Sequence, residues 1–180
     1  MMRCAVWRML LVIGCMSGGL DARYTCGQET QTESPAVASQ AAFLVDGEVE
    51  RPLRLSVAEL ATLPRHTARV TDHNGKEALF AGPPLVEILR LTGVKLGEQL
   101  RGKELTSYIL VKAADGYQVV FALAELDPGF TDRVIFLADQ RDGKPLSAQE
   151  GPWRIIVPEE KRQARWVRQV LSLTVLHGGK

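Results

Sequence analysis

Dipeptides in which Asp or Asn precedes Gly recur along the chain and separate short apolar runs. They stand at Asp46-Gly47, Asn74-Gly75, Asp115-Gly116 and Asp142-Gly143. Such dipeptides favour the tight turns of β-hairpins, because those turns need positive φ angles that Gly and Asn adopt at little cost. Most of the chain is therefore predicted to form short antiparallel strands.

Two short helices interrupt the strand pattern. The first is predicted from the capping-box spacing of Ser56 and Glu59, and Pro64 ends it. The second has Pro84 at its first position and apolar residues at helical spacing up to Gly93. The sequence thus predicts an α+β fold, mixed but mainly antiparallel β, with short helices.

Six strands are predicted after the first helix, in addition to two short extended runs before it. They cover 66–72, 76–81, 105–113, 117–123, 134–138 and 153–157. A last strand is predicted from the alternation of Val167, Leu171, Leu173 and Val175, which would place these four side chains on one face.

Residues 1–22 are predicted to be a signal peptide. Two basic residues precede or flank an apolar run from Met9 to Met16, as in secretory leaders. The run is much shorter than the roughly 20 residues of a spanning helix, so we expect no transmembrane helix. We expect export to the periplasm, either with cleavage after Ala22 or with lipidation of Cys15 in the lipobox-like sequence VIGC, which would anchor the protein.

Composition narrows the functional classes. With 22 basic and 21 acidic residues, the overall charge gives no reason to expect nucleic-acid binding. Cys4, Cys15 and Cys26 all precede the predicted domain at 42–177, so that domain has no disulfide, zinc-thiolate site or catalytic thiol. Residues 23–41 are rich in Ser, Thr, Gln, Glu and Ala, which predicts a flexible polar linker.

Common catalytic and metal-binding patterns are missing from the sequence. His66 and His73 are seven residues apart, which in a strand places them on opposite faces and argues against a shared metal. No Gly-x-Ser-x-Gly turn and no Gly-rich phosphate loop follows a strand. Glu125 and Asp127 could form an acid pair, but the sequence before Pro128 favours a capped helical turn. We therefore predict no metal ligands and identify no catalytic residues.

The most distinctive segment is GPWRIIVPEEKRQARWVRQV, at residues 151–170. An apolar strand in this segment is followed by four basic residues around Trp166: Lys161, Arg162, Arg165 and Arg168. Arginine makes paired, charge-assisted hydrogen bonds to phosphate or carboxylate oxygens, so this cluster predicts an anion site. A solvated basic turn, balanced by neighbouring acidic residues, is the alternative.

Six segments follow one another in a specific order. They are LRLSVAELATLP at 53–64, FAGPPLVEIL at 80–89, DGY at 115–117, LA with DGKPL at 137–146, GPWRIIVP at 151–158 and RQARW at 162–166. In this order and at these separations they resemble the oxidoreductase molybdopterin-binding domain, the fold of sulfite oxidase and its bacterial relatives. The resemblance covers about residues 43–175. It implies a compact, mainly β domain that holds a molybdenum-bound pyranopterin and catalyses oxygen-atom or related redox transfer.

The resemblance also implies cofactor contacts. In that family the basic residues just before the Trp of the last motif help to bind the pterin and its phosphate, which here implies Arg162 and Arg165 with Lys161 beside them. We expect both arginines to face one cleft together with His73 or Asp72. Molybdopterin is the cofactor that the resemblance implies, and a redox protein is the implied partner.

The chain departs from the family at the metal ligand. The family binds molybdenum through a cysteine in the interval that corresponds to residues 65–81, and this interval contains no cysteine here. It offers His66, Asp72 and His73, and neither a carboxylate nor an imidazole is equivalent to a soft thiolate. We expect a domain that binds a pterin or another small anion without ordinary redox catalysis. The alternatives are a non-catalytic module for an anion or a protein, a metal site completed by Asp72 or a solvent oxygen, and a structural lipoprotein anchored through Cys15.

Overall fold

The structure is a computed structural model, and it describes residues 41–179. The strands are β1 (Ala42–Gly47), β2 (Leu53–Ser56), β3 (His66–Thr71), β4 (Glu77–Gly82), β5 (Ser107–Ala113), β6 (Gln118–Ala122), β7 (Phe136–Ala138), β8 (Gln140–Arg141), β9 (Lys144–Pro145), β10 (Arg154–Ile156) and β11 (Val170–His177). The α-helices are α1 (Val57–Ala61) and α2 (Leu85–Arg90). Short 3-10 helices include Gly102–Thr106, Leu123–Glu125 and Gln163–Arg165.

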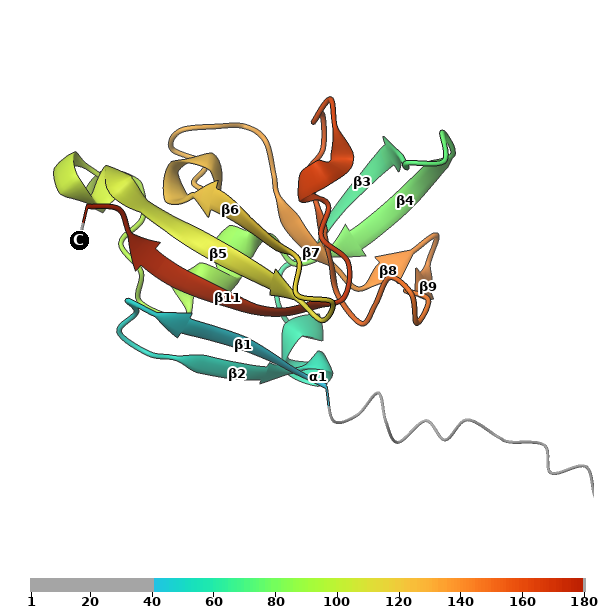
Figure 1. The fold of residues 1–180 in the computed structure, drawn as a ribbon, viewed down its shortest axis with the longest axis horizontal. Coiled ribbons are helices and arrows are strands. Elements are labelled where there is room, and N and C mark those ends of the chain that lie inside the picture. The colour runs from blue at the N-terminus through green and yellow to red at the C-terminus, as the bar shows by residue number, and fades with distance from the viewer. Residues whose placement is uncertain (1–40, 180) are drawn as a thin grey trace, which may run out of the picture. The chain divides into compact units, whose positions relative to one another are not determined.

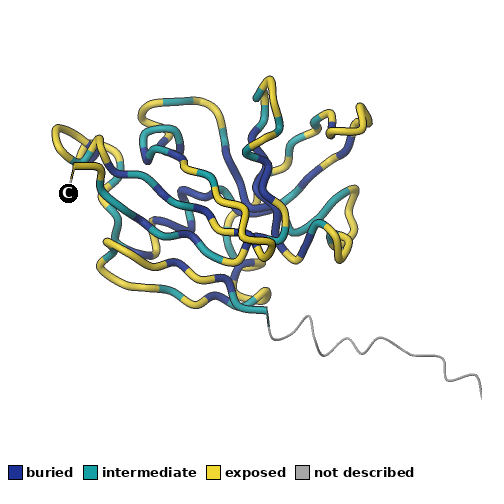
Figure 2. Tube along the Cα trace, viewed as in Figure 1, coloured by how far each residue is buried: buried dark blue, intermediate teal, exposed yellow. Residues whose placement is uncertain are grey.

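The largest sheet has five strands in the order β2-β1-β11-β5-β6 (Figure 1). β1 and β11 run parallel, and the other neighbours are antiparallel. Alternate side chains of β5, such as Ile109 and Val111, are fully buried and belong to one core with Leu85 and Ile88 of α2. One face of this sheet therefore carries the hydrophobic core, as expected for an antiparallel sheet with a wet outer face. The buried stretches meet in the interior, and the turns are exposed (Figure 2).

Two smaller sheets complete the domain. β3, β4, β8 and β9 form an antiparallel sheet, and β10 pairs with β7. The end of β4 passes so close to β7 that a Cβ atom on Gly82 would lie 2.0 Å from the carbonyl oxygen of Leu137. Only glycine fits this crossing, which brings the β3–β4 hairpin against the strands that precede the basic segment.

The predicted fold class and hairpins are confirmed. The four Asx-Gly dipeptides lie at or beside connections between antiparallel neighbours. Gly75, Gly116 and Gly143 have φ angles of 73°, 85° and 76°, which are the conformations that favour glycine. Ser56 and Glu59 form the predicted capping box at the start of α1.

Three details differ from the sequence-based prediction. The last strand begins at Val170 rather than Val167, and a β-bulge between Val170 and Ser172 shifts the alternation. Leu171 is consequently 48% exposed, whereas Leu173 is buried. Pro84 precedes α2 as its N-cap instead of being its first helical residue. Residues 105–106 belong to a 3-10 helix rather than to β5.

The predictions for the signal peptide, for Cys15 and, except at Ala41, for the linker lie outside the described residues. Within residues 41–179, no helix is both long enough and apolar enough to cross a membrane.

The close crossing at Gly82 gives a stability test. Gly82→Ala should lower the free energy of unfolding by about 2–3 kcal/mol, because the backbone of β7 has to move to admit the methyl group. Gly75→Ala is the control: its Cβ meets nothing within 4 Å, so only the positive φ angle is penalised, by about 1 kcal/mol. Chemical denaturation of both variants checks this, and equal losses would contradict the packing account.

Candidate functional site

A cavity of about 370 Å³ lies where two hairpin turns meet the basic segment. Its polar side chains are His73 from the β3–β4 turn, Asp115 and Tyr117 from the β5–β6 turn, Arg154 from β10, and Gln163 and Arg168 from the segment before β11. Its volume is in the range of sites for small ligands. The walls come from four parts of the chain that are far apart in sequence.

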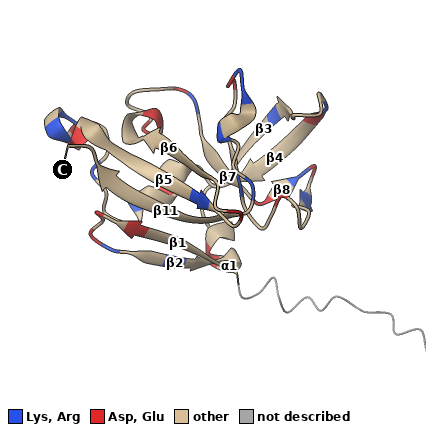
Figure 3. Ribbon diagram, viewed as in Figure 1, with Lys and Arg blue, Asp and Glu red and all other residues tan. Residues whose placement is uncertain are grey.

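Hydrogen bonds fix the basic segment in place. The hydroxyl of Tyr117 donates to the carbonyl of Ala164 at 2.9 Å, and the amide nitrogen of Gln163 donates to the carbonyl of Thr71 at 2.5 Å. The indole of Trp166 donates to the carbonyl of Val157 at 2.9 Å. The segment is thus tied to both neighbouring hairpins, and blue stretches of ribbon near β3 and β7 mark Lys and Arg positions (Figure 3).

Arg154 is the most unusual group in the cavity wall. It is only 2% exposed, and its guanidinium lies 5.4 Å from the ring centroid of Phe80 and 5.7 Å from that of Trp166. Its Nη1 pairs with Glu150, but its buried Nε has no hydrogen-bond partner within the described part of the chain. Burial lowers the pKa of Arg154, and the attraction of Glu150 opposes that effect. A buried donor without a partner costs free energy, which an anion in the cavity would recover.

Asp72 lies behind the cavity at the end of β3. Its Oδ2 accepts a hydrogen bond from Arg141 at 2.5 Å, and its Oδ1 accepts from the backbone amides of Asn74 and Lys76 at 2.8 and 3.1 Å. Burial by itself would raise the pKa of Asp72, but the Arg141 pair and the two amides outweigh it, so that this pKa lies below its usual range. Asp72 is therefore a charged carboxylate that is fully engaged with the protein.

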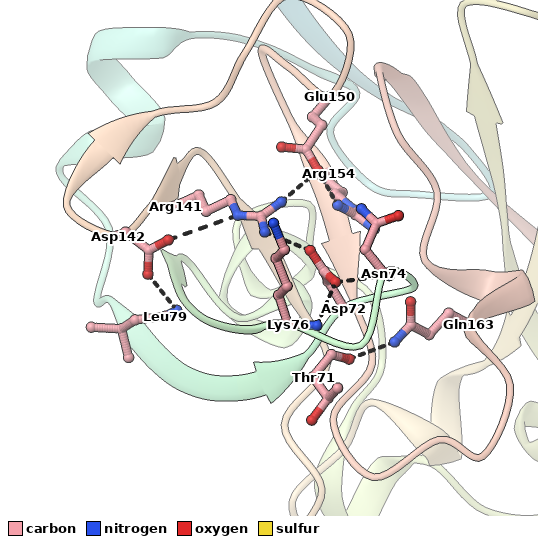
Figure 4. A network of polar contacts seen from close by, with 10 residues as sticks. All are labelled: Thr71, Asp72, Asn74, Lys76, Leu79, Arg141, Asp142, Glu150, Arg154 and Gln163. Carbon is pink, nitrogen blue, oxygen red and sulfur yellow. Dashed lines mark hydrogen bonds and ion pairs between the residues drawn. The ribbon is translucent and has the colours of Figure 1, made fainter.

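Glu150 connects this pair to the cavity. Its carboxylate contacts Arg141 at 3.4 Å and also pairs with Arg154 (Figure 4). Asp72, Arg141, Glu150 and Arg154 form one chain of two anions and two cations. The formal charges of these four groups cancel, which lowers the cost of burying Asp72 and Arg154, and the exposed Asp142 is a further partner of Arg141 at 3.8 Å.

The structure separates the predicted site residues. His73 lines the cavity, and Asp72 lies behind it. Lys161 and Arg162 are exposed on the same segment and do not line the cavity. Their contact with a ligand, and that of Arg165, stays a prediction.

Arg165 is engaged elsewhere. It pairs with Glu160 at 2.6 Å and with Glu125 at 3.0 Å, and its guanidinium lies 4.6 Å from the ring centroid of Phe121. Burial alone would lower the pKa of Arg165, but these two carboxylates raise it above its ordinary value. The same contacts give Glu125 a structural role, and Asp127 accepts hydrogen bonds from the backbone amides of Gly97 and Gly129.

Sequence reasoning missed Arg154, Arg141 and Glu150 as members of the site. A signal for Arg154 was present, since it is the one charged residue in the apolar run from Trp153 to Val157, and a charge in a buried strand needs a partner. Arg141 and Glu150 stand in a turn region where charged residues are ordinary, so nothing local marked them.

The comparisons with known proteins decide the family. A family model, the oxidoreductase molybdopterin binding domain, matches residues 31–178. The chain belongs to this family. Among solved structures it is similar to the sulfane dehydrogenase SoxCD from Paracoccus pantotrophus, with 19% sequence identity and a TM-score of 0.60. That match covers 77% of this chain and 38% of the other, so the two share a fold over less than half of the longer chain. No curated protein matches the chain.

Membership of the molybdopterin-binding family allows a test of fit. The anionic part of such a cofactor fits the cavity, because Arg168 stands on its wall and the buried Nε of Arg154 lacks an acceptor. The metal does not fit in the same way, because residues 41–179 contain no cysteine and Asp72 is already bound to Arg141. The residues present thus match a phosphate-bearing ligand better than a molybdenum centre.

The engaged state of Asp72 predicts a pH effect on stability. Because its folded pKa lies below that of an unfolded carboxyl group, about 3.9, its stabilising contribution is complete above that pH and is lost as the pH falls through the folded pKa. Asp72→Asn should lower the free energy of unfolding by about 2 kcal/mol at pH 7, with the difference from the wild type shrinking below about pH 4.

Denaturant unfolding between neutral and acid pH measures this difference. Asp46→Asn, at an exposed position in β1, is the matched control and should show no comparable loss at pH 7. A difference between wild type and Asp72→Asn that stays constant down to the acid limit would contradict the ion-pair account.

Proposed function

We propose that this chain is an exported domain that binds a pterin cofactor or another small phosphate-bearing anion in the cavity beside the basic segment. The observation that carries the proposal is Arg154, a buried arginine that lines the cavity and whose Nε donor has no hydrogen-bond partner among the residues that the structure describes. A phosphate oxygen is a strong acceptor for such a donor, and the low polarity around the rings of Phe80 and Trp166 strengthens the bond.

Charge supports an anionic ligand. Arg168 is exposed and lines the cavity, so it places a positive charge at the entrance. Asp115 is the one carboxylate among the residues that line the cavity, and its Oδ1 accepts a hydrogen bond from the amide of Tyr117. An anion approaching from solvent would meet Arg168 first and Arg154 further in.

The aromatic groups support a planar ligand. Tyr117 and the buried Trp166 line the cavity, and the half-exposed ring of Tyr117 offers an apolar face of the kind against which a flat heterocycle packs. Tyr117 is held by its hydrogen bond to Ala164 and Trp166 by its bond to Val157, so neither ring has to be ordered on binding. A pterin combines such a ring system with a phosphate, which is why we favour it over a small inorganic ion.

Export and location belong to the same proposal. The basic and apolar start of the sequence supports delivery to the periplasm, with Cys15 as the anchoring position in the lipidated alternative. We expect a redox partner protein only if the bound cofactor contains its metal. The absence of cysteine from the interval 65–81 favours the second candidate function, a non-catalytic module that binds an anion or a partner protein.

Arginine variants locate the site. Inorganic pyrophosphate should raise the melting temperature of the wild-type protein, and Arg168→Ala should weaken its binding about tenfold, as expected for the loss of one charged hydrogen-bonding group. Arg162→Ala, a control on the same segment but off the cavity wall, should bind with nearly wild-type affinity. Thermal shift and isothermal titration measure both.

Two results would count against this assignment. A loss of pyrophosphate affinity in Arg162→Ala but not in Arg168→Ala would place the anion site at the exposed turn that the family resemblance implies. An unchanged melting temperature of the wild type at all pyrophosphate concentrations would reject the anion site altogether.

A further inference from the structure

We infer that the cavity holds its anion without any bond from residues 41–179 to a metal, so that the ligand is a phosphate-bearing organic anion and not a molybdenum centre. This inference rests on the proposed function, because it assumes that the cavity binds an anion. It concerns the side chains of the β3–β4 hairpin and of the cavity wall, which are the groups that a metal at this place would need.

Two side chains at the start of the hairpin, Arg65 and His66, contact other parts of the protein. Arg65 makes two hydrogen bonds to the carboxylate of Asp139, at 3.0 and 2.5 Å. The imidazole of His66 packs edge-on against the ring of Phe136, with 5.1 Å between the ring centroids, and His66 is not among the residues that line the cavity. Only His73, at the tip of the hairpin, reaches the cavity wall.

Asp72 is the carboxylate that lies nearest in sequence to His73, and it is already used. Both of its oxygens accept hydrogen bonds from the protein, and its side chain is completely buried. A metal could take this carboxylate only if Arg141 were released, which would leave this partly buried guanidinium with Glu150 at 3.4 Å and Asp142 at 3.8 Å as its remaining partners. Asp72 therefore pairs with Arg141 and is not free to coordinate a metal.

The cavity wall offers one imidazole and one carboxylate, and both are poor choices for molybdenum. His73 is an imidazole on an exposed turn, and Asp115 is a carboxylate whose Oδ1 closes the turn before Tyr117. Within residues 41–179, no group of three or more His, Cys, Asp or Glu side chains is arranged to hold a metal. Nitrogen and oxygen donors of this kind do not replace a soft thiolate.

The engaged carboxylate instead supports the anion site. Asp72 holds Arg141, Arg141 contacts Glu150, and Glu150 holds Nη1 of Arg154. With this end of the guanidinium fixed, the Nε of Arg154 stays unpaired within the described structure. The β3–β4 hairpin would have to carry the metal ligand, but it carries Asp72 instead. Asp72 is part of the ion-pair network that positions Arg154, a hydrogen-bond donor for an anion.

The test uses the full chain, produced in a host that makes molybdenum cofactor and is supplied with molybdate. Molybdenum is measured by elemental analysis, and bound pterin by fluorescence after oxidative release, in wild type, His73→Ala and Arg162→Ala. In parallel, the melting temperature is followed in pyrophosphate titrations with and without a strong chelator. The fluorescence separates a pterin from other organic phosphates.

We expect no stoichiometric molybdenum in any of the three proteins, and a pyrophosphate-induced stabilisation that the chelator does not change. About one molybdenum per chain, lost in His73→Ala and kept in Arg162→Ala, would overturn the metal-free inference and leave the proposed anion site standing. Absence of both pterin and pyrophosphate stabilisation would overturn the proposed function, and this inference with it. His73 is exposed, so its replacement should not affect folding.

Discussion

The ion-pair network of Asp72, Arg141, Glu150 and Arg154 is the interaction on which the site depends. It joins the end of the β3–β4 hairpin to β8, to the loop before β10, and to β10 itself. A buried arginine is stable only with partners of opposite charge, so the position of Arg154 depends on the two carboxylates and on the hairpin that carries Asp72. Arg154 is the member of this network that lines the cavity.

The fold brings these groups together through its turns. Residues of the two hairpin turns and of the basic segment line one cavity, and the hydrogen bonds from Tyr117 and Gln163 tie the segment to both hairpins. The close crossing at Gly82 keeps β4 against β7. Strands therefore supply the rigid support and loops supply most of the polar groups, a common division of labour in binding sites.

The sequence predicted the fold more completely than it predicted the residues of the candidate site. Asx-Gly dipeptides, the capping box at Ser56 and the apolar runs are local signals, and each predicted an element that the structure contains. The bulge before Ser172 was missed because it arises from pairing with β5, not from local propensity. The basic segment, singled out from the sequence, contributes Gln163, Trp166 and Arg168 to the cavity wall, and its role in binding an anion stays a prediction. Which of its arginines reaches the cavity depends on contacts such as Arg165 with Glu125, 40 residues away in sequence, which no spacing rule could give.

The central claim is that an anion bound in the cavity contacts Arg154. Nitrogen-15 NMR of the arginine side chains tests it most directly, because each Nε–H group reports its own hydrogen bond. On addition of pyrophosphate, we expect the largest change in chemical shift at the Nε–H of Arg154, with a smaller change at Arg168. Changes confined to Arg162, with the Arg154 signal unmoved at saturation, would contradict the account.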